Sequence, residues 1–257
     1  MKILAPALRD GRTVCAILIA SGSPIAVEVV GDLGFTAVVV DARHGPVSPY
    51  SHNVGDLVRA ARAASVAALV RLPESTPGTI NRSLNDGVDG VIVPSVSDAT
   101  QAREVAMAAR YPPLGLRGAA PVVRAAGYGV RDWDEYRDEA NTDQLALCSL
   151  ETQTALDAAP AILAVDGIDG VVIDALSMAM DAGGVATAPD VLDGVLAAVL
   201  AADESGKTCA VILPDVERVA EWAAAGCRLL VVDSDLSACL RAMRRARAAM
   251  GPKEKAE

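Results

Sequence analysis

An aspartate and a histidine that follow a run of valines are the first residues whose types and spacing suggest chemistry. The segment reads Val-Val-Val-Asp-Ala-Arg-His-Gly-Pro over residues 38–46. We expect a buried strand to end at Asp41, which places His44 in the following loop. In parallel α/β proteins such loops carry the active site. Asp41 could orient the imidazole and leave its other nitrogen free to move a proton, whereas a surface histidine beside a helix-capping aspartate is the alternative.

Two more charged residues lie in or at the end of apolar runs. Arg71 stands inside Leu-Val-Arg-Leu-Pro, and Glu151 ends Cys-Ser-Leu-Glu. A buried guanidinium needs an anionic partner, which is either a substrate carboxylate or enolate, or an internal pair with Glu151 or an aspartate. Glu151 could bind a divalent metal, shuttle a proton or cap the helix expected after it.

The elements that must position these residues follow a regular alternation. Eight short, β-branched apolar runs are separated by helical patterns, many of which end at a glycine. The runs span residues 15–20, 37–42, 67–72, 90–96, 145–151, 170–175, 208–213 and 229–233. Continuous apolarity indicates strands buried on both faces, as in a parallel sheet. We therefore predict an α/β fold, a (β/α)8 TIM barrel, with an open doubly wound sheet as the alternative.

Composition restricts the class of protein further. Hydrophobic residues make up 52% of the 257 residues, aromatic residues only 3%, and the formal net charge is −10. The charge argues against a nucleic-acid partner, and the apolar runs are too short to cross a membrane. Five scattered cysteines suggest a reduced, cytoplasmic protein. We expect one domain over residues 1–250, a disordered tail over 251–257, and a functional role for the long connection 111–142.

Several motifs occur together and in order along the chain. They are Gly34-Phe35, Asp41-x-x-His44-Gly-Pro, Val70-Arg71-x-Pro, Val93-Pro94, Arg110-Tyr-Pro-Pro-Leu-Gly-Leu-Arg117-Gly, Glu151-Thr and Val165-x-Gly-x-Asp-Gly-Val. In combination the chain resembles the class II pyruvate aldolases of the hydroxy-oxo-heptanedioate (homoprotocatechuate pathway) family, over about residues 12–250.

The resemblance implies a barrel that assembles as a homohexamer with its last helix packed on a neighbour. It also implies a carbon–carbon lyase that acts on a small carboxylic acid through a pyruvate enolate held on Mg²⁺ or Mn²⁺. By the same resemblance, His44 would be the acid/base with Asp41 as its partner, Arg71 would bind the pyruvate oxygens, and Glu151 would be one metal ligand.

Two departures from the family pattern affect the metal site. Ser177 stands where the family has its second carboxylate ligand, and Arg43 stands where the family usually has an acid. Because Mg²⁺ prefers carboxylate oxygens, both changes should weaken the site unless Asp174 serves as the replacement ligand. We expect Arg43, Ser177 and Arg117 to contact the substrate.

Three hypotheses remain open from the sequence. The first is a metal-dependent aldolase of a 2-oxo acid. The second is a relative without metal that uses His44 and Arg71 on another small anion, for decarboxylation, cyclisation or addition. The third is a barrel without catalytic activity.

Overall fold

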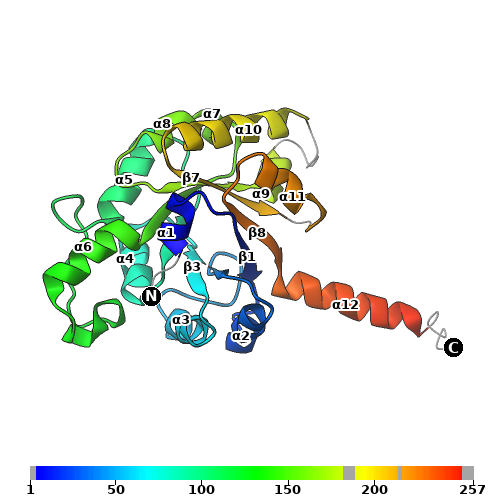
Figure 1. Ribbon diagram of the computed structural model, residues 1–257, viewed down its shortest axis with the longest axis horizontal. Coiled ribbons are helices and arrows are strands. Elements are labelled where there is room, and N and C mark those ends of the chain that lie inside the picture. The colour runs from blue at the N-terminus through cyan, green and yellow to red at the C-terminus, as the bar shows by residue number, and fades with distance from the viewer. Residues whose placement is uncertain (1–3, 182–188, 214–215, 251–257) are drawn as a thin grey trace.

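The chain forms a closed barrel of eight parallel strands in sequence order, surrounded by helices (Figure 1). The computed structural model describes residues 4–181, 189–213 and 216–250. The strands are β1 (Val14–Ile19), β2 (Ala37–Asp41), β3 (Ala67–Arg71), β4 (Gly90–Val93), β5 (Leu145–Leu150), β6 (Gly170–Asp174), β7 (Thr208–Leu213) and β8 (Leu229–Ser234). Because β1 pairs in parallel with β8, the prediction of a TIM barrel is confirmed and the open sheet is wrong.

The helices lie between the strands, as expected for right-handed βαβ units. They are α1 (Leu4–Arg9), α2 (Pro24–Asp32), α3 (Asn53–Ala63), α4 (Pro77–Asn85), α5 (Ala99–Ala109), η1 (Arg124–Gly129), α6 (Trp133–Asp143), α7 (Gln153–Asp157), α8 (Ala159–Leu163), α9 (Ala175–Asp181), α10 (Pro189–Glu204), η2 (Val216–Arg218), α11 (Val219–Ala224) and α12 (Asp235–Ala249). Local sequence sets several starts: Ser23 and Thr76 cap α2 and α4 through their side chains, and each is followed by a proline.

Side chains inside the barrel form a core separate from the one between strands and helices. The interior core includes Val39, Leu69, Leu147 and Val172, which come from four different strands. Helix α1 closes the amino-terminal end of the barrel, because its Leu4, Ala5 and Leu8 belong to the same core. The sequence analysis did not predict α1.

The interior changes from apolar to polar at the carboxyl ends of the strands. Side chains alternate between the two faces of a strand, so a residue two positions after an inward-facing one also points inward. Asp41, Arg71, Ser149 and Asp174 each lie two positions after an apolar residue of the interior core. All four are buried. The strand pattern therefore places a polar layer on top of an apolar barrel core.

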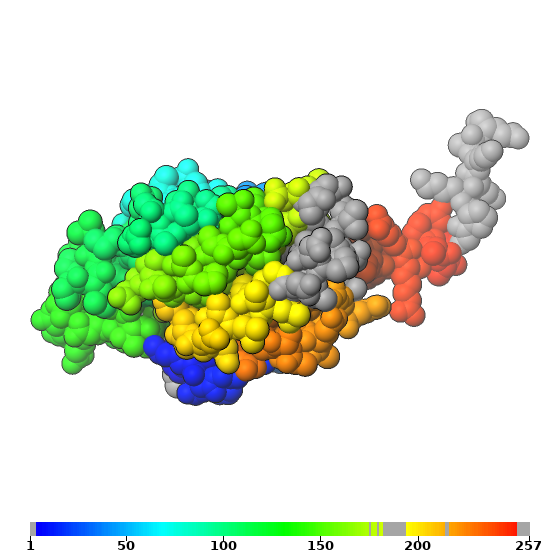
Figure 2. All heavy atoms as spheres, turned by 90° about the horizontal axis from the view of Figure 1, so that it is seen from above, coloured from blue at the N-terminus to red at the C-terminus, as the bar shows by residue number. Residues whose placement is uncertain are grey.

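Helix α12 extends away from the barrel as a direct continuation of β8 (Figures 1 and 2). Every residue from Leu236 to Met250 is exposed. Leu236, Leu240 and Met243 recur at helical spacing and form one apolar stripe. The expected tail 251–257 lies outside the described residues. Among the described helices, none has the length and apolarity required to cross a bilayer.

Candidate active site

The polar residues singled out from the sequence meet, with one exception, at the carboxyl-end rim of the barrel. Asp41 and Arg71 end β2 and β3 and are register neighbours. Glu151 follows β5, and Asp174 ends β6. In barrels of this type the catalytic groups come from these strand ends and the loops after them.

The carboxylate of Asp41 holds the loop after β2 by bonding to backbone N–H groups of that loop. Oδ1 of Asp41 accepts hydrogen bonds from the backbone N–H groups of Arg43 at 3.0 Å and His44 at 3.1 Å. A Cβ atom at Gly45 would lie 2.5 Å from the carbonyl oxygen of Asp41 and 3.0 Å from that of Ala20, so the turn requires glycine. Asp41 therefore positions His44 through the main chain. Within the described residues, no hydrogen bond or ion pair joins the Asp41 carboxylate to the imidazole.

The imidazole of His44 faces solvent at the rim. His44 is exposed, and its ring has no hydrogen-bond partner among the described residues. An imidazole with neither nitrogen committed to the protein can accept a proton from a bound molecule or donate one to it.

Arg71 forms an ion pair across the mouth of the barrel. Its Nη2 atom donates to Oδ2 of Asp174 at 2.5 Å, and the two residues are only 5% and 3% exposed. The pair joins β3 to β6, three strands further around the barrel. Of the two internal partners considered for Arg71, Glu151 or an aspartate, the structure has the aspartate. Nε of Arg71 and Oγ of Ser149 are buried without a hydrogen-bond partner in the described part of the chain.

A second ion pair crosses the mouth from β2 to β5. Nη1 of Arg43 donates to Oε1 of Glu151, and Oγ of Ser95 donates to Oε2 at 3.0 Å. Thr152, not Glu151, caps α7. Sequence reasoning missed Ser95, which lies two residues after Val93, the last residue of β4. The sequence feature that could have identified Ser95 is a polar residue just after a strand end, which is the feature that identified the other rim residues.

Ser177 lies beside Asp174 at the start of α9. Its backbone N–H donates to Oδ1 of Asp174 at 3.1 Å. All four oxygens of Glu151 and Asp174 are therefore hydrogen-bond acceptors within the protein, and each carboxylate is paired with a guanidinium.

This donor set does not fit the expected Mg²⁺ or Mn²⁺. A divalent cation about 4 Å from a guanidinium would be repelled by about 8 kcal/mol at an effective dielectric constant of about 20. Here Arg43 and Arg71 already neutralise Glu151 and Asp174, the two expected ligands.

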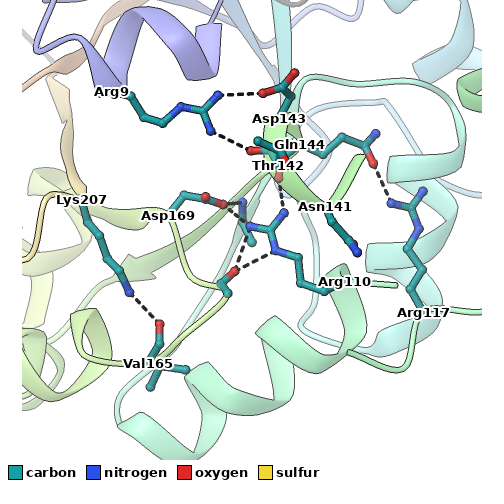
Figure 3. A network of polar contacts seen from close by, with 12 residues as sticks. Arg9, Arg110, Arg117, Asn141, Thr142, Asp143, Gln144, Val165, Asp169 and Lys207 are labelled. Carbon is teal, nitrogen blue, oxygen red and sulfur yellow. Dashed lines mark hydrogen bonds and ion pairs between the residues drawn. The ribbon is translucent and has the colours of Figure 1, made fainter. Parts of the chain in front are cut away.

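Arg117 is the exception, because its partners lie at the opposite end of the barrel. Figure 3 shows its contact with Gln144. Its Nη1 donates to Oε1 of Gln144 at 2.6 Å and its Nη2 to Oδ1 of Asn85 at 2.9 Å. Gln144 precedes β5, and Asn85 lies at the end of α4. Burial lowers the pKa of the Arg117 guanidinium, and nearby tyrosines oppose that change.

The connection 111–142 lies at the same end as Arg117. Nη1 of Arg124 donates to the carbonyl oxygen of Asp86, and Arg9 of α1 binds the carbonyl oxygen of Thr142. A tyrosine and tryptophan cluster, with Tyr111 and Trp133 in edge contact, packs the connection. The functional role expected for this connection would require it to lie near the rim, but these contacts place it at the base of the barrel.

Comparisons with known proteins agree with this architecture. The chain is 30% identical over 236 residues to the hydroxypyruvate/pyruvate aldolase of Roseobacter denitrificans, covering 91% of both chains. A crystal structure of an HpcH/HpaI aldolase/citrate lyase family protein from Burkholderia cenocepacia superimposes with a TM-score of 0.90 at 26% identity, covering 98% of this chain and 100% of that one.

A more distant structure shows a metal within the same fold. It is a citrate lyase β subunit from M. tuberculosis in complex with oxaloacetate and magnesium, with a TM-score of 0.55 and 18% identity over 90% of this chain and 95% of that one. The profile of the HpcH/HpaI aldolase/citrate lyase family matches residues 16–242. These findings confirm the prediction of an aldolase-type carbon–carbon lyase: the chain belongs to the HpcH/HpaI aldolase/citrate lyase family.

Proposed function

We propose that this protein makes or breaks a carbon–carbon bond of a 2-oxo acid through a pyruvate-type enolate at the rim of the barrel. The observation that carries the proposal is the exposed imidazole of His44 in the loop after β2, on the rim that also holds Arg43 and Arg71 in ion pairs across the mouth. A base and fixed cations are what an enolate reaction requires. The name of the Roseobacter denitrificans relative supports a pyruvate aldolase rather than decarboxylation, cyclisation or addition on another anion.

Substrate binding is assigned to the two arginines and the polar layer beneath them. A guanidinium can donate two parallel hydrogen bonds to a carboxylate. Buried polar atoms without a partner mark positions where a ligand or water supplies the missing bond. Nε of Arg71 and Oγ of Ser149 are such atoms below the mouth. Ser177 lies beside Asp174 and would border the bound acid.

His44 would move the proton. In the cleavage direction it would accept the proton of the hydroxyl group next to the breaking bond, and in the synthetic direction it would return it. The bonds from Asp41 to the loop backbone hold His44 in place during both steps. The sequence-based expectation that Glu151 and Asp174 hold Mg²⁺ or Mn²⁺ is left out of these steps, because both carboxylates are paired with arginines.

Exchange of the methyl protons of pyruvate for deuterium tests the proposal. We expect the wild-type protein to catalyse this exchange, followed by proton NMR in D₂O. Loss of a general acid/base lowers rates by about 10²–10⁴-fold, so His44→Gln should lose most of the exchange. The second histidine, His52, precedes α3, and His52→Gln is the control that should keep the rate. Absence of exchange by the wild-type protein, both without metal and with added Mn²⁺, would refute the proposed function.

Self-association through α12 is part of the same proposal, and the resemblance suggests a hexamer. The stripe of Leu236, Leu240 and Met243 is exposed in a single chain and would be buried against a second copy. We expect light scattering to give an oligomer for the wild-type protein and smaller species for Leu240→Asp. Ala238→Asp on the other side of α12 should keep the wild-type mass. A monomeric wild-type protein would contradict this prediction.

The five free cysteines, three of them buried, are consistent with the cytoplasmic location that we include in the proposal.

A further inference from the structure

Arg43 lies where a cation would be needed to activate the proposed substrate. Its side chain is 21% exposed, so it is accessible from the mouth of the barrel. Only Nη1 has a hydrogen-bond partner among the described residues, and that partner is Glu151. Nη2 and Nε remain able to donate to a bound molecule. Because the guanidinium is planar and always charged, the ion pair with Glu151 also fixes the direction of those free N–H groups.

Glu151 is itself held in place on its second oxygen. Oγ of Ser95 donates to Oε2 at 3.0 Å, while Oε1 accepts from Arg43. A carboxylate bound on both oxygens in this way orients the neighbouring cation, and its negative charge is already balanced by that cation. The hydrogen bonds from Ser95 to Glu151 and from Arg43 to Glu151 therefore hold the Arg43 guanidinium in place at the mouth.

We propose that the Arg43 guanidinium, held by Glu151, takes the place of a divalent cation, so that this protein activates a 2-oxo acid without metal. The inference rests on the proposed function. The inference assigns the positive charge that activates the substrate to Arg43 and not to a metal ion. Asp174 would then be a partner of Arg71 and not a metal ligand.

The enolisation step balances without a co-reactant. The proton leaves the methyl carbon of pyruvate for the imidazole of His44. The electron pair of that C–H bond forms the carbon–carbon double bond of the enolate, and the electron pair of the carbonyl double bond moves onto the oxygen. Arg43 donates hydrogen bonds to that oxygen, which carries more negative charge in the enolate than in the ketone. The exposed imidazolium exchanges this proton for a deuteron of the D₂O solvent, and return of the deuteron to the methyl carbon completes the exchange.

Binding of Mn²⁺ to chelator-treated protein is the first test, because it does not depend on activity. The electron paramagnetic resonance signal of free Mn²⁺ should be the same with and without the wild-type protein, and the melting temperature should not change. The double variant Arg43→Glu/Ser177→Asp, which restores acids at both departures from the family pattern, should bind Mn²⁺ and reduce the free signal. Binding by the wild-type protein that Glu151→Gln removes would overturn the inference.

The second test is exchange of pyruvate methyl protons in the presence of a chelator. The wild-type rate should be unchanged by EDTA and by added Mn²⁺. Arg43→Gln should lower it about 100-fold or more, since a fixed donor to the developing oxyanion is lost. Arg59→Gln is the matched control, because Arg59 is exposed and pairs with Asp56 on α3. Exchange that EDTA abolishes, or that Arg43→Gln leaves intact, would contradict the inference.

The two tests separate the inference from the proposed function. If the wild-type protein neither exchanges pyruvate protons nor gains activity with Mn²⁺, the proposed function fails, and the role of Arg43 as an activating cation fails with it. If it exchanges protons only with bound Mn²⁺, the proposed function stands and the inference alone is wrong.

Discussion

Arg71→Ala should remove both the activity and a large part of the stability. Arg71 is one of the two arginines proposed to bind the substrate. Loss of such a positioned donor lowers rates by about 10²–10³-fold, and we expect at least this loss in the pyruvate exchange assay. Breaking a buried pair from one side costs about 3–5 kcal/mol, because the remaining charge stays buried without a partner. Here the remaining group is Asp174, which is 3% exposed. Urea unfolding followed by circular dichroism measures this second effect.

A double variant distinguishes the two roles of Arg71. Replacement of a buried ion pair by apolar residues of similar size is often close to neutral for stability. Arg71→Met/Asp174→Leu should therefore recover much of the unfolding free energy that Arg71→Ala loses, while the exchange activity stays absent. Full activity in Arg71→Ala, or in the double variant, would show that this arginine serves the fold only.

Arg110→Ala should be the most destabilising substitution at the base of the barrel. Arg110 is 2% exposed, and its Nε and Nη2 atoms donate to the carbonyl oxygen of Gly167 at 3.1 Å and 2.9 Å. Its Nη1 donates to the carbonyl oxygen of Gln144 at 2.6 Å, and Nη2 also pairs with Asp169 (Figure 3). Loss of a buried charge that satisfies several acceptors costs about 3–5 kcal/mol, which urea unfolding would detect.

The destabilisation in Arg110→Ala should depend on pH. Burial raises the pKa of the Asp169 carboxyl, and the Arg110 guanidinium opposes that rise. Without Arg110 the folded protein favours the protonated carboxyl more strongly, so stability is lost as pH rises through the higher pKa. The unfolding free energy that Arg110→Ala loses relative to wild type should thus be smaller at acidic pH. Arg137→Ala, which changes a partly exposed arginine on α6 in a surface ion pair with Asp134, should leave the unfolding midpoint nearly unchanged. If Arg110→Ala lost the same unfolding free energy at every pH, the role of the Asp169 carboxyl in this pH dependence would be contradicted.

The strands were predictable because each is a continuous apolar run, and all eight runs match strands within a few residues. The polar rim was predictable for a related reason. Asp41, Arg71 and Asp174 each lie next to the last residue of such a run and end the strand itself, and parallel strands bring their carboxyl ends to one side. Helix α1 was missed, since its six residues are too short for a helical period to show.

The pairing of charges could not be predicted. The partners Arg43 and Glu151, like Arg71 and Asp174, are about a hundred positions apart and come from strands three apart in the barrel. Nothing local indicates which acid faces which arginine. Arg117 was misplaced for a similar reason: its motif indicates a special loop, but not the end of the barrel that the loop covers.

The way in which Asp41 holds the loop after β2 has a consequence for how this site can evolve. The carboxylate binds backbone N–H groups, which every residue except proline supplies. Positions 43 and 44 can therefore exchange one side chain for another, even an acid for a base, while the turn keeps its shape as long as Gly45 is retained. New reactivity can arise here by single substitutions without rebuilding the scaffold that presents it.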